Sequence, residues 1–211
     1  MDSALQEEAE RLFGPGVESP DPAGAAPGGG PSPVSAAPMM RLSDRQQRRL
    51  WARVREIENF WYSLREIEPG AVARLAAAAA AHEWDVLFIT TRPSCAGATT
   101  QLQSQRWLQE HGFELPSVYV VSGSRGRIAT ALTLDAVIDD RAENCLDVAT
   151  DSNATPILVW RDAPDAVPPG APRLGIKVVY SIAEALQHLE SADDGSNRPG
   201  IMGRLRAMLG A

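Results

Sequence analysis

The distribution of apolar and polar positions divides the second half of the chain into alternating strands and helices. Short, continuous apolar runs predict strands that are covered on both faces, and apolar residues at helical spacing predict the helices between them. The predicted strands span residues 85–90, 117–121, 136–138, 155–160 and 177–180, and the predicted helices span 99–111, 128–132, 143–148 and 181–190. This alternation predicts an α/β fold with a three-layer, Rossmann-like parallel sheet and helices on both faces.

The first half of the chain combines predicted helices with one segment that has no means of packing. Helices are expected at residues 4–12, 41–55 and 71–81. Residues 14–38 contain seven prolines and six glycines and almost no large apolar side chain, so they cannot bury enough surface to offset their ordering entropy. We therefore expect three regions, which are a disordered Pro/Gly/Ala-rich N-terminal arm at 1–40, a folded domain at 41–190, and a linker with a short amphipathic helix at 191–211.

Composition narrows the possible partners and compartments. The chain has 20 basic and 27 acidic residues and a net charge of −7. This balance argues against nucleic acid as a partner, because phosphate contacts need clustered positive charge. Two cysteines and three scattered histidines make neither a disulfide framework nor a zinc site. No apolar run approaches the roughly 18 residues that span a bilayer, so we expect a cytoplasmic protein without a transmembrane segment.

Polar residues that follow the predicted strands form the candidate site, because ligands of open parallel sheets bind at the carboxyl ends of the strands. Thr90, Thr91 and Arg92 follow the first strand and offer hydroxyl and guanidinium donors to a phosphoryl group. Taken alone, these three residues fit an ordinary strand end better. Arg125 or Arg127, after a Gly-Ser turn at the start of a helix, offers a positive charge to a phosphate. The alternative is an ordinary turn, because Gly-Ser turns join many strands to helices.

Asp139 and Asp140 end the third predicted strand. Two adjacent carboxylates at the end of an apolar strand lose hydration free energy unless a positive group lies nearby. A hard divalent cation such as Mg²⁺ is a natural partner for these oxygen ligands. The alternative is that one aspartate caps the next helix while the other is solvated. An acidic pair in this position favours the metal.

Together these features resemble the haloacid dehalogenase superfamily, a large Rossmann-like group of Mg²⁺-dependent phosphohydrolases. Residues 88–92 resemble its second motif, Arg125 or Arg127 lies where its third motif carries a basic residue, and residues 137–140 resemble its acidic fourth motif. Residues 69–72 resemble the stretch that follows the cap insertion in the deoxyribonucleotidase-like branch. The resemblance covers about residues 56–190, and it implies phosphate binding at the threonines and arginines and Mg²⁺ binding at the aspartates.

The first motif of that superfamily, a strand followed by Asp-x-Asp, is absent from this chain. The only aspartates before residue 69 are Asp2, Asp21 and Asp44, and none of them follows an apolar strand. In the superfamily the first aspartate of this motif is the nucleophile and the second is the general acid and base. The strand that carries the motif, central in the family's sheet, is missing as well. We therefore expect very low phosphatase activity in a domain that retains its metal and phosphate groups.

Three functions follow as expectations. The first is a catalytically impaired pseudoenzyme that binds a small phosphorylated ligand. The second is an active Mg²⁺-dependent phosphatase that acts on a nucleotide-like phosphomonoester through an unrecognised nucleophile. The third is a protein-interaction module that docks through the arginine-rich helix at 41–55 or through the C-terminal helix, where apolar residues recur at helical spacing (Ile201, Leu205, Met208 and Leu209).

Three smaller expectations concern packing. Six aromatic residues are expected to pack in the core rather than to stack on a base, namely Trp51, Phe60, Trp61, Tyr62, Trp84 and Trp107. The polar run Gln101, Gln103, Ser104 and Gln105 is expected to form a solvated helix face, although some of these side chains are long enough to reach a ligand. Cys95 is expected to be an ordinary thiol and Cys145 a buried packing residue.

Overall fold

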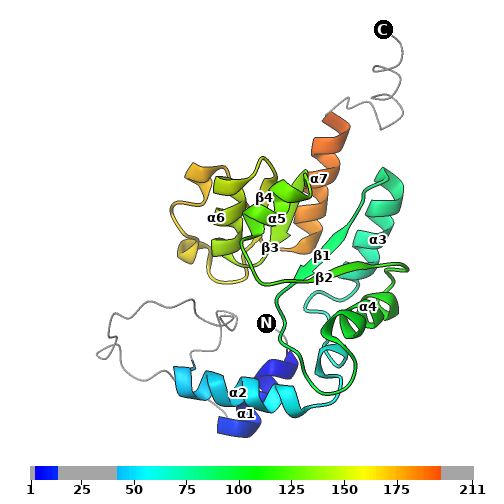
Figure 1. Cartoon of the computed structure of the whole chain (residues 1–211). Coiled ribbons are helices and arrows are strands. Elements are labelled where there is room, and N and C mark those ends of the chain that lie inside the picture. The colour runs from blue at the N-terminus through cyan, green and yellow to red at the C-terminus, as the bar shows by residue number, and fades with distance from the viewer. Residues whose placement is uncertain (1–2, 14–41, 196–211) are drawn as a thin grey trace. The chain divides into compact units, whose positions relative to one another are not determined.

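The protein has a mixed α/β structure that contains parallel strands (Figure 1). The computed structural model describes residues 3–13 and 42–195. The chain divides into two compact units, and each is described by itself. Unit 1 comprises residues up to 76 together with 85–123, and unit 2 comprises residues 77–84 together with those from 124 onward. Helix α3 (Ala71–His82) contributes residues to both.

Unit 1 begins with helices that the sequence pattern predicts well. Its elements are α1 (Ser3–Phe13), α2 (Asp44–Glu56), the short 3-10 helix η1 (Phe60–Tyr62), β1 (Leu87–Thr90), α4 (Thr100–Glu110) and β2 (Ser117–Val120). Helix α2 starts with a capping box, in which Ser43 Oγ accepts from Gln46 N and the Gln46 side chain accepts from Ser43 N. These reciprocal bonds explain why the helix begins where Ser43 stands.

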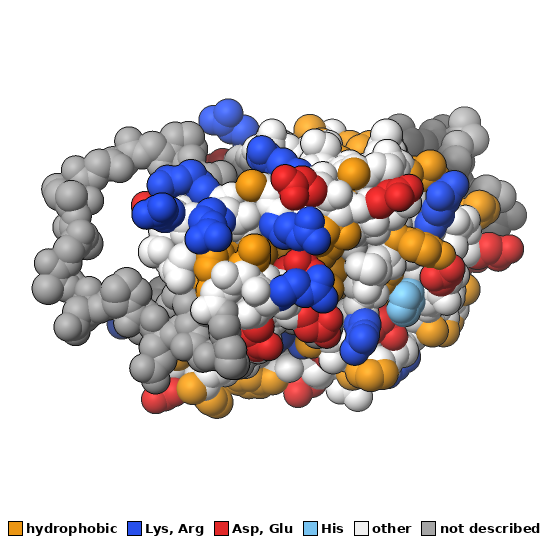
Figure 2. All heavy atoms as spheres, turned by 90° about the horizontal axis from the view of Figure 1, so that it is seen from below, with side chains coloured by type: hydrophobic (Ala, Val, Ile, Leu, Met, Phe, Trp, Pro, Cys, Tyr) orange, Lys and Arg blue, Asp and Glu red, His pale blue; other side chains and the backbone are white. Residues whose placement is uncertain are grey.

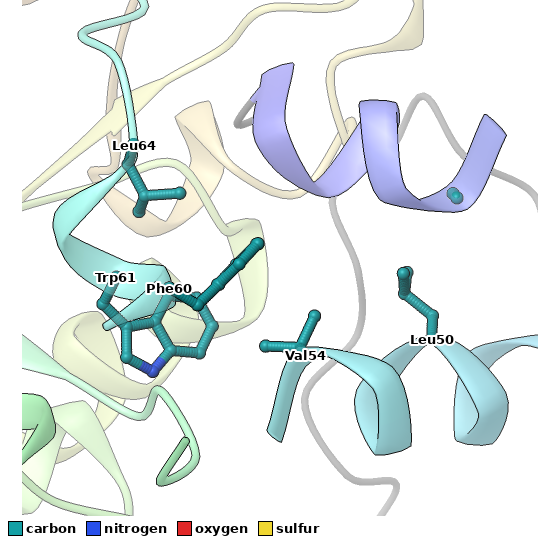
Figure 3. Close-up of a cluster of buried hydrophobic side chains, with 6 residues drawn as sticks. Leu50, Val54, Phe60, Trp61 and Leu64 are labelled. Atoms are coloured by element: carbon teal, nitrogen blue, oxygen red, sulfur yellow. The ribbon is translucent and has the colours of Figure 1, made fainter. Parts of the chain in front are cut away.

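The core of unit 1 joins α1, α2 and η1 (Figure 3). Leu50, Val54, Phe60 and Trp61 are all at most 2% exposed, and Ala9 of α1 is fully buried with them. Phe60 and Trp61 therefore fill the core as predicted, and Trp51 and Trp107 pack against it partly buried, whereas Tyr62 is 37% exposed. The helix expected at 4–12 is confirmed as α1, whose apolar side packs here, so this part of the predicted 1–40 arm is ordered. The remainder of that arm, residues 1–2 and 14–40, lies outside the described residues.

Unit 2 is a three-stranded parallel sheet with helices on both faces. Its elements are α5 (Arg125–Ala131), β3 (Ala136–Asp139), α6 (Ala142–Asp151), β4 (Thr155–Val159), the 3-10 helices η2 (Pro164–Ala166) and η3 (Pro172–Leu174), β5 (Lys177–Val179) and α7 (Ile182–Gly195). The strand order is β3-β4-β5. Val137 packs with Ala129 of α5 and Val148 of α6, whereas Ile138 packs with Ala185 of α7. Because neighbouring residues of a strand point to opposite faces, these helices cover opposite faces of the sheet.

All five predicted strands are present, but their pairing differs from the single sheet that we expected. In unit 1, β1 pairs in parallel with β2, with Leu87 opposite Ser117. In unit 2, β4 lies between β3 and β5. Among the described residues no strand pairing joins the two sheets, so β1 and β3 each have a strand partner on one edge.

The hydrogen bonds of β4 explain a proline inside a central strand. Thr155 N donates to Asp135 O at 2.9 Å, so the odd-numbered residues of β4 face β3. Trp160 N donates to Val179 O at 2.8 Å, so the even-numbered residues face β5. Pro156 lies on the β5 side, one residue before β5 pairing begins at Ile157. Its missing N–H therefore removes no bond from the sheet.

Candidate functional site

The candidate site in unit 2 is built around Asp139, the last residue of β3. Its Oδ1 accepts from Arg141 N at 2.9 Å, and Asn144 Nδ2 lies 3.0 Å from Oδ1 and 2.9 Å from Oδ2. Arg125 Nε lies 3.9 Å from Oδ2. The strand end, the start of α5 and the first turn of α6 therefore meet at one carboxylate.

Burial disfavours the charged forms of both Asp139 and Arg125, so it shifts their pKa values in opposite directions. Burial raises the pKa of Asp139 above its ordinary value, and the charge of Asp140 adds to this, although the hydrogen bonds from Asn144 and Arg141 N and the nearby Arg125 act the other way. Burial also lowers the pKa of the Arg125 guanidinium, against the attraction of Asp139. Each group thus reduces the penalty that burial imposes on the other.

Arg125 is the residue of this site whose side chain has a buried donor without an acceptor among the described residues. It is the first residue of α5, directly after the N-cap Ser124, and its side chain is only 7% exposed. Its Nη1 is buried and has no hydrogen-bond partner within residues 3–13 and 42–195. A buried donor without an acceptor carries its full desolvation penalty, and a guanidinium is the group best suited to carboxylate or phosphate oxygens.

The first turn of α6 lies beside the same carboxylate. Its N-cap is Arg141, which makes no side-chain capping bond to the helix. The first N–H groups of a helix have no intrahelical acceptor, and the helix dipole favours negative charge at this end. An anion close to Asn144 would therefore be attracted by the start of α6 and by Arg125, against the repulsion of the Asp139 and Asp140 carboxylates.

The predicted metal ligands do not form a ready Mg²⁺ site. Both oxygens of Asp139 already accept N–H donors, and the guanidinium of Arg125 occupies the position of a counter-charge. Asp140 is exposed to solvent. Within the part of the chain that the structure describes, no group of three or more His, Cys, Asp or Glu side chains is arranged to hold a metal ion. Binding of Mg²⁺ by Asp139 and Asp140 stays a prediction.

The other predicted phosphate ligands fall in different surroundings. Arg127 is exposed, and its backbone N donates to Ser124 Oγ. Thr90, Thr91 and Arg92 belong to unit 1, where Thr90 Oγ1 accepts from Arg92 N and the Arg92 guanidinium lies 5.2 Å from the Trp61 ring centroid. Arg125 and Asp139 are thus the predicted residues that the structure brings together.

Asn144 is the site residue that the sequence interpretation did not assign. It lies five positions after Asp139, and the turn between β3 and α6 returns its amide to that carboxylate. A side-chain amide following a strand-end aspartate by about one helical turn is the only signal that the sequence offers for it.

The polar run on α4 contradicts our prediction of a solvated face at two of its four residues, Gln103 and Ser104, whereas Gln101 is exposed as predicted. Gln103 is 1% exposed and Ser104 is 5% exposed. Gln103 Oε1 accepts from Trp61 N at 3.0 Å, and Ser104 Oγ donates to Thr100 O at 2.9 Å. Burial of these polar groups is compensated by hydrogen bonds, which Gln103 makes to backbone outside its helix and Ser104 makes to the preceding turn of α4.

Cys145 is predicted to resist thiol reagents in the folded protein. It is fully buried, and burial, followed by the charges of Asp139 and Asp140, raises the pKa of its thiol to about 12. Because the thiolate is the reactive form, a Cys95→Ser variant should take up no iodoacetamide at pH 8 until it is unfolded in guanidinium chloride. Mass spectrometry of the native and unfolded samples measures this. Labelling of the native variant at the unfolded rate would contradict the burial of Cys145.

The predicted docking surfaces are partly described. Arg45, Arg48, Arg49 and Arg55 are exposed on α2. Figure 2 views the protein from the side on which α2 lies in Figure 1, and its basic side chains there are interspersed with acidic and apolar ones. The predicted C-terminal helix lies outside the described residues. The described helices include none that is long and apolar enough to cross a membrane.

Comparison of the chain with family models, with curated proteins and with solved structures finds no match.

Proposed function

We propose that this chain is a haloacid-dehalogenase-like domain that binds a small phosphorylated ligand in unit 2 and does not hydrolyse it efficiently. The observation that carries the proposal is the buried Nη1 of Arg125, which lacks an acceptor beside Asp139 and Asn144. A phosphoryl oxygen supplies that acceptor. The N-terminus of α6 favours the ligand's remaining negative charge.

The strand orders support the Rossmann-like part of this proposal. A doubly wound sheet of this type has the order 3-2-1-4-5-6, so the chain starts in the middle, moves outward and then switches sides. The observed orders β2-β1 and β3-β4-β5 are the two outer parts of that order when its first strand is left out. The sequence lacks the same strand, because no Asp-x-Asp follows an apolar run before residue 69.

The surroundings of Asp139 support binding over hydrolysis. Hydrolysis in the superfamily uses two carboxylates, a nucleophile and a general acid and base. Beside Asp139, the carboxylate whose charge acts on it is that of Asp140, which is exposed to solvent. Asp139 itself is held by Arg141 N and Asn144 and lies close to Arg125, so attack by this carboxylate would require it to leave these donors. Because both oxygens of Asp139 already accept N–H donors and lie close to Arg125, Mg²⁺ fits this carboxylate poorly. Ligand binding at this site therefore does not depend on the metal.

Replacing Arg125 by lysine is expected to weaken binding of inorganic phosphate and of nucleoside monophosphates about tenfold, since lysine keeps the charge but lacks the planar donor pair. The matched control is Arg127→Gln on the same helix, which removes an exposed arginine and should change binding less than about twofold. Isothermal titration calorimetry, with and without Mg²⁺, measures the affinities. Circular dichroism confirms that both variants fold.

A parallel assay separates binding from catalysis. Hydrolysis of an aryl phosphate and of nucleoside monophosphates in the presence of Mg²⁺ should equal that of an Asp139→Asn/Asp140→Asn variant. Turnover that the double variant loses would establish the active phosphatase instead. Absence of phosphate binding in the folded wild-type protein, or equal affinities of wild type and Arg125→Lys, would overturn the proposed site.

A further inference from the structure

Strand β3 has the composition of an interior strand but lies at the edge of its sheet. Val137 packs against α5 and α6 on one face, and Ile138 packs against α7 on the other. Parallel strands with apolar residues on both faces are typical of sheet interiors, where both neighbours are strands. Yet every residue of β3 is only half-buried, whereas Pro156 to Val159 of the central strand β4 are buried.

Backbone groups of alternate residues in β3 point toward β4 and away from it, which identifies the groups on the edge that faces away from β4. Asp135 O accepts from Thr155 N of β4, so the odd-numbered residues of β3 face β4. The N–H and C=O groups of Ala136 and Ile138 therefore face away from β4. In the described part of the chain no strand pairs with them. Unpaired edge groups of this kind are a template for an additional strand.

The opposite edge of the same sheet is protected differently. Strand β5 has three residues and begins with the exposed Lys177. Short strands and edge lysines are devices that prevent strand addition. Strand β3 is one residue longer, and its first three residues, Ala136, Val137 and Ile138, are uncharged; its charged residue, Asp139, comes at its end. The β5 edge is therefore better protected against strand addition than the β3 edge.

We propose that the free edge of β3 receives a parallel strand from a partner polypeptide, an extended apolar segment with an acidic residue directly after it. Apolar side chains on both sides of the segment suit the helix-covered faces of the sheet. The acidic residue follows from charge complementarity. A parallel strand ends at the same side as β3, where Arg125 has a buried Nη1 without an acceptor.

This inference goes beyond the proposed function, since its main interaction is backbone pairing and does not require a phosphorylated ligand. Both use Arg125, so phosphate and the acidic residue of the partner should compete for it. The test measures peptide binding in phosphate-free buffer. Its failure then leaves the phosphate affinities of the proposed function untouched, and failure of phosphate binding leaves the peptide result standing.

The experiment titrates the full chain with a fluorescently labelled, capped peptide of sequence Thr-Val-Ile-Val-Asp-Gly and follows fluorescence anisotropy. Ala136→Pro is the decisive protein variant. Proline at the first residue of an edge strand is tolerated, and here it removes an N–H that faces away from β4. We expect this variant to melt near the wild-type temperature and to bind the peptide about tenfold more weakly.

Control peptides test the two other elements of the proposal. N-methylation of the central isoleucine removes a backbone donor and should weaken binding about tenfold, while Asp→Asn in the peptide should weaken it about fivefold. Equal affinity of wild type and Ala136→Pro, or no saturable binding by the wild type, would overturn the proposal. Sedimentation showing a wild-type dimer that Ala136→Pro dissociates would overturn it too, because the occupant would be a second copy.

Discussion

Replacing Gly126 by alanine is expected to lower the free energy of unfolding by about 3 kcal/mol, because the new methyl group has no space. Gly126 lies in α5 and is buried against α6. An ideal Cβ at this position would overlap the carbonyl oxygen of Asp147 and would lie 2.6 Å from the Cβ of Asp151. Because the overlap is with the backbone of α6, it can be removed only if α5 and α6 move apart.

The matched control for this prediction is Gly123→Ala. Apart from Gly123 itself and its two neighbours in the chain, no described residue has a heavy atom within 4 Å of the position that a Cβ would take at Gly123, and its φ is not in the left-handed region. Alanine there should leave stability unchanged or raise it by up to about 1 kcal/mol, because it restricts the unfolded chain. Urea denaturation of the three proteins measures both changes. Equal midpoints for wild type and Gly126→Ala would show that α5 and α6 do not pack this closely.

The same close approach bears on the candidate site. Arg125 precedes Gly126, and Asn144 lies in the first turn of the helix that Gly126 contacts. Separation of α5 and α6 would move the guanidinium away from Asp139. We therefore expect any folded Gly126 variant to bind phosphate more weakly than wild type, through loss of positioning rather than loss of a contact.

The regular elements were largely predictable from the sequence because their signals are local. Strand β4 is a continuous apolar run, and α2 follows a serine with glutamine three residues later, so both patterns act over a few residues. Helix α1 was likewise visible at 4–12. Its packing on α2 was not predicted, since it depends on a contact between segments that residues 14–41 separate.

The candidate site was predictable only in outline. From the sequence, Arg125 and Arg127 were equivalent candidates for phosphate binding. The structure distinguishes them, because helix α5 buries Arg125 and leaves Arg127 exposed. Likewise, nothing local reveals that β3 is an edge strand, since its sequence resembles that of an interior strand. Strand pairing joins residues distant in the chain, so hydrophobic pattern alone cannot assign neighbours.

The burial of Gln103 was the clearest error of the sequence interpretation, and it has a simple physical cause. A glutamine among polar residues on a helix resembles a solvated position. Its actual partners are a backbone N–H 42 residues earlier, at Trp61, and the sulfur of Cys95 and the carbonyl of Ala98 in the preceding loop. Polarity along the chain does not distinguish a side chain that meets water from one that meets buried backbone.

Replacing Gln103 by alanine should therefore lower the free energy of unfolding by about 3 kcal/mol, although the residue is polar. The change leaves Trp61 N and Ala98 O without their partner and opens a cavity next to the core of unit 1. Gln109→Ala on the same helix is the control, because it removes an exposed bond to Glu114 O and should cost less than about 0.5 kcal/mol. Urea denaturation followed by tryptophan fluorescence measures both. Equal stability losses would mean that Gln103 is solvated after all, and that η1 is held to α4 by apolar contacts alone.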